Sequence, residues 1–406
     1  MKLDLNSFLD ALSFTLDFIE IDYLGATTNH SKRVAYIAQR IALYFNMSTE
    51  ERIDLFSCSI LHDNGLCEDV LHTGTLAETP SDKRILLEHY TIHCDIGEQN
   101  IKNYPFLTDT KNVIKYHHEH YDGSGFFGKS GDEIPLMAQI IALADTVDNL
   151  FHFDNTSLEN RKLITEYITA HRGTHYSDKI VNAFLYINAT ESFWLDLQDA
   201  FIEDVLQKVN IHHSIDIELE DIYEISKVFS KIVYAKSGFT YRHTNDLIKK
   251  ADIITDYYKF DREQKLKFMI AANLHDLGKL AIPNAIINKV DELTQEEFRI
   301  LKSHAYCTGA ALQKVEGFED IGKWAANHHE TLDGGGYPYG IGASELGFEE
   351  RLLGCLDIYQ ALVEDRPYRK AYTHKEAMQI ITKSVDAGKL DKNIVKDIDT
   401  VFMPLK

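Results

Sequence analysis

The strongest constraint on the fold is an internal repeat in which polar residues recur after a long interval. Ten of the 19 histidines and four aspartates take part. The first set is His30, His62, Asp63, His93, His117, His118 and Asp145, and the second is His243, His275, Asp276, His304, His328, His329 and Asp357. Counterparts lie 211 to 213 positions apart. This pattern predicts two copies of one structural unit.

The segments around these residues repeat as well. LHDNG at 61–65 corresponds to LHDLG at 274–278, and HHEHYDGSGF at 117–126 corresponds to HHETLDGGGY at 328–337. A chain of 406 residues is also too long for one ordinary core. We place the boundary after the amphipathic segment Phe201–Val209, which gives domains 1–212 and 213–406.

The hydrophobic pattern predicts the all-α fold class, with two tandem helical bundles. Apolar residues recur at helical spacing in several segments, while alternating strand patterns are scarce. The clearest helical segments are Val34–Phe45, Leu247–Tyr258, Phe298–Val315 and Ala377–Val385. Glycine clusters at 123–131 and 333–342 follow the double histidines, so we expect loops there that border the histidine sites.

Composition limits the partners and the location of the protein. The chain has 42 basic and 63 acidic residues, and a net charge of −21 disfavours binding to polymeric nucleic acid or to an anionic membrane. No run approaches the roughly 20 apolar residues that span a bilayer, and no signal peptide is recognisable. We therefore expect a cytoplasmic protein.

The five cysteines do not suggest a covalent framework. Their number is odd and none forms a CxxC pair, which argues against disulfide bonds and against a zinc ribbon. We interpret them as reduced and mostly buried thiols. They are Cys58, Cys67, Cys94, Cys307 and Cys355.

The repeated polar residues predict a metal centre in each half. Five histidines and two aspartates are a ligand set for transition metals such as Fe, Mn, Ni, Co or Zn, and a poor set for Ca²⁺. Seven ligands suit two divalent ions, between which an aspartate following a histidine can form a bridge. Such a pair holds a hydroxide as a nucleophile for phosphoester hydrolysis. The alternative is that the histidines are structural and recur only because of the duplication.

The second half resembles the HD-GYP family of the HD phosphohydrolase superfamily. The resemblance rests on LHDLGKLAIP at 274–283, HHETLDGGGYP at 328–338, LDIYQAL at 356–362 and EDRPYR at 364–369. It implies a helical HD domain that hydrolyses 3′,5′-cyclic dinucleotides, either cyclic di-GMP or cyclic GMP-AMP. In this interpretation the chain has two tandem HD domains, and the second is the catalytic one.

The resemblance also implies roles for individual residues. The seven polar residues of the second set match the family's metal positions, with Asp276 as the bridging carboxylate. Some members hold a third metal through a glutamate one turn before the first histidine. Phe239 occupies that position here and cannot bind a metal. We therefore expect a binuclear centre, with Fe or Mn favoured and Ni, Co or Zn as alternatives.

Four further residues of the second half are candidates for contact with substrate. Lys279 lies four residues after His275, and we expect it on the same helical face, where its ammonium would neutralise phosphate charge as part of catalysis. Tyr337 is expected to line the substrate pocket. Arg366 and Arg369 are expected to hold the second phosphate or a guanine edge, with a structural salt bridge as the alternative.

The first half keeps all seven candidate metal ligands but changes the residues around them. Leu66 replaces Lys279, Phe126 replaces Tyr337, and NLFHFD at 149–154 replaces the segment that bears the arginines. Without these cations, charge in the transition state is not compensated. We expect this half to bind metal, hydrolyse poorly and act as a regulatory or structural partner.

Two other functions remain open from the sequence. The chain could be a catalytically weak cyclic-dinucleotide receptor with structural metal centres, or an HD phosphohydrolase acting on linear nucleotides. The duplication could produce a pseudo-dimer within one chain, and a homodimer is the alternative.

Overall fold

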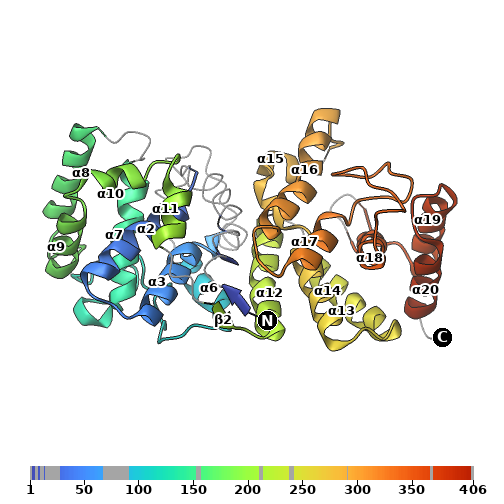
Figure 1. Ribbon diagram of the computed structural model, residues 1–406, viewed down its shortest axis with the longest axis horizontal. Helices are drawn as coiled ribbons and strands as arrows, with labels where there is room; N and C mark the ends of the chain where they lie inside the picture. The colour runs from blue at the N-terminus through green and yellow to red at the C-terminus, as the bar shows by residue number, and fades with distance from the viewer. Residues whose placement is uncertain are drawn as a thin grey trace. The chain divides into compact units, whose positions relative to one another are not determined.

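The computed structural model describes residues 2–4, 8–9, 13, 28–66, 91–151, 157–209, 214–236, 242–289, 291–365 and 369–403. The chain divides into two compact units (Figure 1). The first unit is formed by residues 4–215, and the second by residues 216–406 together with residues 1–3. The boundary expected near residue 212 falls within 210–213, outside the described residues.

The first unit is a bundle of helices. Its elements are α2 (His30–Tyr44), α3 (Thr49–Leu61), α6 (Ile92–Asn100), η1 (Gly131–Glu133), α7 (Leu136–Phe151), α8 (Leu158–Ala170), α9 (Asp178–Ile187), α10 (Glu191–Asp196) and α11 (Ile202–Val209). Helix α2 packs against α3, α7, α9 and α11. Most of its residues are therefore buried, which makes it the central helix of this unit.

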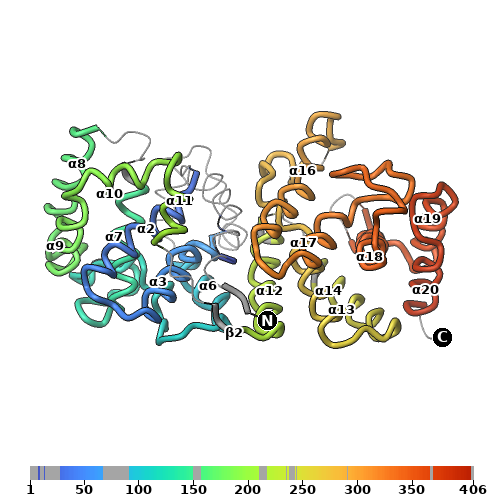
Figure 2. Tube along the Cα trace, viewed as in Figure 1, coloured from blue at the N-terminus to red at the C-terminus, as the bar shows by residue number. Residues whose placement is uncertain are grey.

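The second unit is also helical, and Figure 2 follows its chain from α12 to α20. Its elements are α12 (Leu219–Lys236), α13 (Arg242–Tyr257), α14 (Arg262–Leu274), η2 (Leu277–Ala281), α15 (Asn284–Ile287), α16 (Gln295–Leu312), α17 (Glu319–Ala326), α18 (Phe348–Val363), α19 (His374–Asp386) and α20 (Lys392–Phe402). Two three-residue strands, β1 (Lys2–Asp4) and β2 (Ser214–Asp216), pair with each other. They are the only strands among the described residues.

Local sequence explains where several helices begin. Ser48 accepts a hydrogen bond from the backbone N–H of Glu51, whose side chain accepts one from the N–H of Ser48. Thr294 and Glu297 form the same reciprocal pair at the start of α16. Such capping boxes satisfy backbone donors that the helix itself leaves free. The helices that carry site residues therefore start at defined positions.

The helices predicted from hydrophobic periodicity are confirmed, with one difference at Lys279. Helix α14 ends at Leu274, and Lys279 lies in the 3₁₀ helix η2. The expectation that Lys279 shares a helical face with His275 is wrong for this reason. The chain leaves α-helical geometry at the His-Asp pair, so residue spacing beyond it no longer follows a 3.6-residue turn.

A glycine in each unit allows two backbone segments to approach closely. A Cβ atom placed on Gly278 would lie 2.0 Å from the carbonyl oxygen of His304, and one on Gly65 would lie 2.2 Å from that of His93. Both distances are far inside van der Waals contact. The glycine that follows the His-Asp pair is therefore required for the packing of η2 against α16 and of its counterpart against α6.

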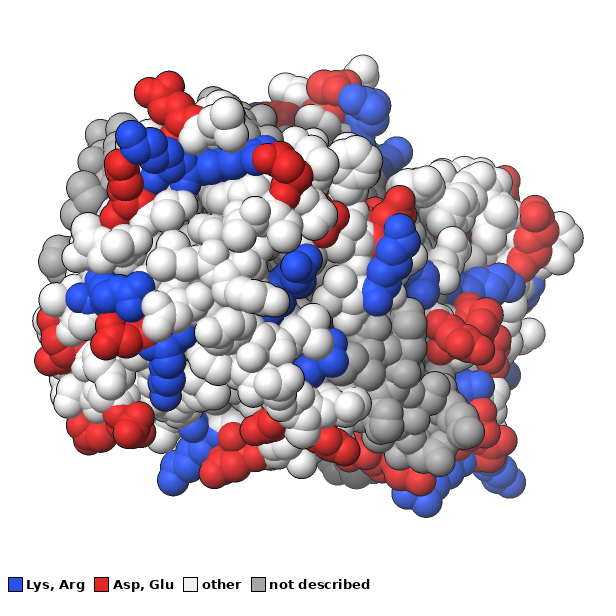
Figure 3. Space-filling model, turned by 60° about the vertical axis from the view of Figure 1, so that its left-hand side comes forward, with Lys and Arg blue, Asp and Glu red and all other residues white. Residues whose placement is uncertain are grey.

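One face of the described structure carries charges of both signs (Figure 3). On the face drawn in Figure 3, Lys and Arg side chains are interspersed with Asp and Glu. Within the described ranges, no helix is both long and apolar enough to cross a bilayer. The cytoplasmic location stays a prediction.

Cys58, Cys94, Cys307 and Cys355 are free thiols, and all but Cys307 are buried. Cys67 lies outside the described residues.

We expect Gly278→Ala to destabilise the second unit by about 1–3 kcal/mol, because the added methyl group forces η2 away from α16. Chemical denaturation would measure this change in the free energy of unfolding. Gly335→Ala is the matched control, since its Cβ would meet only the side chain of Asp333, at 3.2 Å. Equal stability of the two variants would contradict the proposed packing role.

Candidate metal centres

Five places in each unit supply the predicted ligands. In the second unit, His243 lies on α13, the His275-Asp276 pair follows the end of α14, His304 lies on α16 and Asp357 lies on α18. His328 and His329 follow α17 closely. The first unit uses α2, the end of α3, α6 and α7 in the same way. The structure thus brings together residues that are up to about a hundred positions apart in each half.

In the second unit the ligands form two groups that meet at Asp276. One group is His243, His275 and Asp357, and the other is His304, His328 and His329; within each group the ligand atoms lie within 4.8 Å of one another. Asp276 directs one oxygen to each side. Its Oδ2 lies 3.3 Å from Nε2 of His275, and its Oδ1 lies 3.5 Å from Nε2 of His304.

The first unit repeats this geometry. Oδ2 of Asp63 lies 3.5 Å from Nε2 of His62, and Oδ1 lies 3.7 Å from Nε2 of His117. Oδ1 of Asp145 lies 3.3 Å from Nε2 of His30, as Oδ1 of Asp357 lies 3.4 Å from Nε2 of His243. Each unit therefore has an aspartate positioned between two ligand groups.

Backbone carbonyls orient the histidine rings toward these groups. Nδ1 of His275, His304 and His328 lies 2.7–2.8 Å from the carbonyl oxygen three residues earlier. A carbonyl oxygen can only accept, so Nδ1 carries the hydrogen and a neutral ring presents the Nε2 lone pair. Nε2 of all three is buried and has no hydrogen-bond partner. This orientation is typical of metal-binding histidines.

The residues present fit divalent transition metals. Two ligand atoms bound to one ion at about 2.0–2.2 Å lie roughly 3–3.5 Å apart, close to the separations found here. Buried nitrogen atoms without hydrogen-bond partners, such as Nε2 of His62, His117 and His275, carry a free-energy cost that a bound ion would remove. Imidazole and carboxylate ligands together match the borderline metals expected from the sequence.

The protonation states of His304, His329 and Asp276 are those of metal ligands, whereas, against the lowering effect of burial, Asp357 and Glu364 raise the pKa of His243 to about 9. Burial lowers the pKa of His304 to about 3 and that of His329 to about 4, so both rings are neutral near pH 7. Burial acts to raise the pKa of Asp276, but His275 and Lys279 hold it well below its usual range. A neutral imidazole and an ionised carboxylate are the forms that bind metal.

The sequence did not reveal the carboxylates that orient the first histidine of each unit. Oε2 of Glu364 lies 2.6 Å from Nδ1 of His243, and Oδ2 of Asp148 lies 2.6 Å from Nδ1 of His30. The two carboxylates do not correspond in the repeat, because Gln360 stands at the position equivalent to Asp148. The repeat therefore gave no sign of them.

A second missed residue is the glutamate that follows each double histidine. Oε1 of Glu330 accepts hydrogen bonds from the backbone N–H groups of Tyr339 and Gly340, at 2.6 and 3.0 Å. Glu119 accepts from Phe127 and Lys129 in the same manner. This glutamate fixes the glycine-rich turn against the double histidine. Its presence in both copies was the available signal.

The predicted turn residue Tyr337 lies beside the metal ligands of the second unit. Its ring centroid is 4.7 Å from that of His329 and 6.3 Å from that of His304. Nζ of Lys302, which the sequence analysis did not single out, lies 5.2 Å from the centroid of the same ring. An aromatic face and a cation thus stand together at the side of the centre formed by His304 and His329.

The predicted cations have different surroundings. Nζ of Lys279 lies 2.6 Å from Oδ2 of Asp276, which places it at the centre. The guanidinium of Arg369 donates to the backbone oxygens of Ala361, Leu362 and Lys370. These bonds favour a structural role for Arg369 at the end of α18, and its contact with substrate stays a prediction. Arg366 and Phe239 lie outside the described residues.

At the positions equivalent to Lys279 and Tyr337, the first unit has apolar side chains. Leu66 is buried at the position equivalent to Lys279. Phe126 takes the place of Tyr337, and its ring centroid lies 6.0 Å from that of His118. The two centres therefore share ligand geometry but differ in the charge and polarity beside it.

Comparison with known families shows which family the chain belongs to. The family described as "HD domain" matches residues 19–180 and 227–394, with one match in each half. The chain belongs to the HD domain family. The prediction of two tandem HD domains with an all-helical fold is confirmed.

Several known proteins are similar to this chain. The 3′3′-cGAMP-specific phosphodiesterase 1 of Vibrio cholerae is 27% identical over 387 residues, covering 93% of this chain and 87% of that protein. The 3′3′-cGAMP-specific phosphodiesterase 3 of the same organism is 27% identical over 430 residues. That alignment covers 94% of this chain and 91% of that protein. The cyclic di-GMP phosphodiesterase response regulator RpfG of Xanthomonas campestris is 29% identical over 165 residues, covering 40% and 43%.

A solved structure supports the fold across the whole chain. The crystal structure of the V. cholerae cyclic GMP-AMP specific phosphodiesterase V-cGAP3 aligns with a TM-score of 0.68 and 23% sequence identity. The alignment covers 100% of this chain and 99% of that one. The fold is therefore shared with a solved protein over the length of both chains.

We expect Glu364→Ala to weaken metal binding by the second unit roughly 10- to 100-fold, because His243 loses the carboxylate that orients its ring. Competition with a chelator would measure the dissociation constant. Glu345→Gln is the control, since Glu345 is exposed and its side chain has no part in the centre. Unchanged affinity in Glu364→Ala would show that this carboxylate does not support the ligand.

Proposed function

We propose that this chain is a metal-dependent phosphodiesterase that hydrolyses a 3′,5′-cyclic dinucleotide to the linear dinucleotide, and that the second unit carries the activity. The observation that supports this most directly is the placement of Lys279 and Tyr337 beside a shared carboxylate, Asp276, and two groups of ligands. Two divalent ions, when bound there, would supply an activated water and polarise the phosphate.

The residues of this chain have separable tasks in that reaction. Asp276 would hold both ions, one through each oxygen, and so fix their separation. Lys279 would stabilise the negative charge that develops on the phosphate and on the leaving 3′ oxygen. Tyr337 and Lys302 would position the substrate, through the face of a base and through the second phosphate. The iron or manganese expected from the sequence, and two ions per centre, are part of this proposal.

For the substrate we favour 3′3′-cyclic GMP-AMP over cyclic di-GMP. The two relatives that match more than nine-tenths of this chain carry that specificity in their names. The cyclic di-GMP phosphodiesterases among the relatives match between 27% and 40% of it. The relatives that are similar over both units are therefore the ones named for 3′3′-cyclic GMP-AMP. The test is a product time-course with each cyclic dinucleotide at equal metal loading.

For the first unit, which contains most of the predicted domain 1–212, we propose a regulatory or structural role with a retained metal centre. Its ligand geometry matches that of the second unit, but Leu66 and Phe126 provide no charge or hydrogen bond to a phosphate. A metal ion without the counterparts of Lys279 and Tyr337 beside it can bind more readily than it can promote displacement at a diester. Oligomeric state stays a prediction.

Single substitutions would separate the two units. We expect Asp276→Ala to abolish hydrolysis and to lower the metal content by up to two ions per chain, because both ions lose their shared ligand. We expect Asp63→Ala to lower the metal content similarly while retaining most of the hydrolysis. Metal analysis and product chromatography measure the two effects. Activity that survives in Asp276→Ala and disappears in Asp63→Ala would reverse the assignment.

We expect Lys279→Met to lower kcat by about 10²–10³-fold at unchanged metal content, since one stabilising charge is removed from the transition state. Single-turnover kinetics and metal analysis on the same sample provide the measurements. Lys375→Met, at an exposed position on α19, is the matched control. If metal content falls together with kcat, Lys279 acts by positioning Asp276 rather than by contact with substrate.

The alternative of a cyclic-dinucleotide receptor predicts a different result. Such a protein would bind the ligand at the second unit and release it unchanged under both iron and manganese loading. Calorimetry in parallel with chromatography distinguishes binding from turnover.

A further inference from the structure

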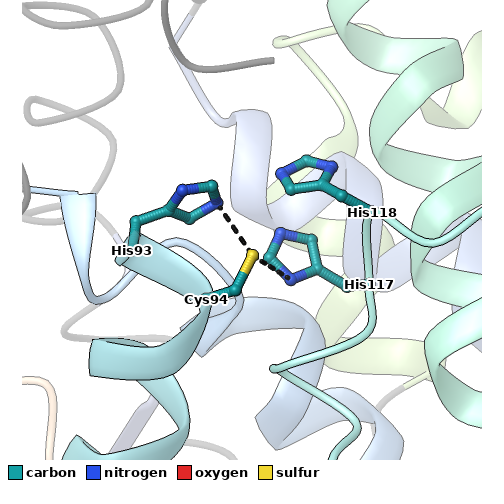
Figure 4. A group of neighbouring side chains, drawn as sticks. All are labelled: His93, Cys94, His117 and His118. Atoms are coloured by element: carbon teal, nitrogen blue, oxygen red, sulfur yellow. Dashed lines mark hydrogen bonds between the residues drawn. The ribbon is translucent and has the colours of Figure 1, made fainter. Parts of the chain in front are cut away.

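A thiol lies among the histidines of the first unit and has no part in the ligand set expected from the sequence. Cys94 follows His93 on α6, and its side chain points toward His93, His117 and His118 (Figure 4). One ligand atom from each of these four residues lies within 4.8 Å of the others. Cys94 is completely buried, so this thiol faces the histidines rather than solvent.

The separation between the thiol and His93 matches that of two ligands on a single ion. Sγ of Cys94 lies 3.4 Å from Nε2 of His93. A metal ion at about 2.0–2.1 Å from nitrogen and 2.3 Å from sulfur, with tetrahedral angles, places these two atoms about 3.5 Å apart. The pair could therefore bind one ion with little rearrangement.

A second observation points to a ligand at the same place. His117 is completely buried, and its Nε2 has no hydrogen-bond partner. Its Nδ1 lies 2.5 Å from the carbonyl oxygen of Ile114, which fixes Nε2 as the atom that carries the lone pair. Nε2 of His117 lies 3.7 Å from Oδ1 of Asp63, whereas Nδ1 lies 4.0 Å from Sγ of Cys94. A buried nitrogen without a hydrogen-bond partner is costly unless something binds to it.

We propose that the first unit holds one of its ions through the thiolate of Cys94 together with His93, His117 and His118. The inference rests on the proposal above that this unit binds metal, and it adds the ligand that determines which metal. The sulfur–metal bond forms as the S–H bond breaks, and the proton leaves to solvent. A zinc or cobalt ion suits this set of three imidazoles and one thiolate better than manganese does.

The corresponding position of the second unit has no such group. Ala305 follows His304 where Cys94 follows His93, and the ligand groups found among the described residues of that unit contain only His and Asp. The two units of one chain thus differ in ligand softness, and they select different ions from the same mixture. Together with Asp63, whose Oδ1 lies 3.7 Å from Nε2 of His117, the thiolate and the three imidazoles would leave this ion fewer positions for a substrate oxygen than the ligands of the second unit leave. A smaller number of positions for substrate agrees with a non-catalytic first unit.

Cobalt spectroscopy on the full-length chain tests the thiolate directly. The Asp276→Ala background reduces metal binding by the second unit, and the metal-free protein is then loaded with Co²⁺. We expect a near-ultraviolet charge-transfer band from sulfur to cobalt, and we expect Cys94→Ala to remove it. Cys58→Ala, which removes another buried thiol of the same unit, should retain the band. Zinc affinity should fall at least roughly tenfold in Cys94→Ala, with a smaller change for manganese.

Three results would overturn the inference. The first is cobalt bound by the first unit without a charge-transfer band, which needs no Cys94 variant and so does not depend on its folding. The second is a band that persists in Cys94→Ala. The third is a first unit that binds no metal, which also removes the retained centre proposed above. None of these measurements uses hydrolysis, so a failure of the proposed phosphodiesterase activity is distinguishable from a failure of this inference.

Discussion

A buried carboxylate shared between two groups of histidines determines how each unit is built. Burying an ionised aspartate is costly unless cations or hydrogen bonds compensate. In the second unit, His275, His304 and Lys279 surround Asp276. These side chains come from different helices, so the helices must meet at one point. The backbone approach at Gly278 allows α16 to come close enough. Packing and metal chemistry therefore depend on the same contact.

The two units differ in the residues next to this contact rather than in the contact itself. Ligand separations in the first unit match those in the second within a few tenths of an ångström where they correspond. Beside them, the second unit has a lysine and a tyrosine where the first has Leu66 and Phe126. Differences in electrostatics next to similar metal centres can separate catalysis from binding, because hydrolysis needs stabilisation of a charge that develops only in the transition state.

The sequence predicted much of this because the repeat preserved the ligands and helical periodicity located the helices that carry them. It did not predict contacts that the two copies make with residues at different positions. Glu364 and Asp148 orient equivalent histidines from positions that do not correspond, so no repeat marks them. Lys279 was placed on a continuing helix, although α14 ends at Leu274. Cys94 was interpreted as one more buried thiol, since its relation to His117 and His118 exists only in three dimensions.

The aromatic residues that differ beside the two centres lie on turns, and this affects how such a chain can diverge after duplication. The ligands lie on helices or at helix ends whose backbone is fixed by packing, whereas Tyr337 and Phe126 lie on turns that Glu330 and Glu119 tie down through backbone N–H groups alone. Those bonds do not involve the side chain of Tyr337 or of Phe126. After a duplication, one copy can therefore exchange its substrate-facing residues, and lose its reaction, by a few substitutions that leave folding and metal binding intact.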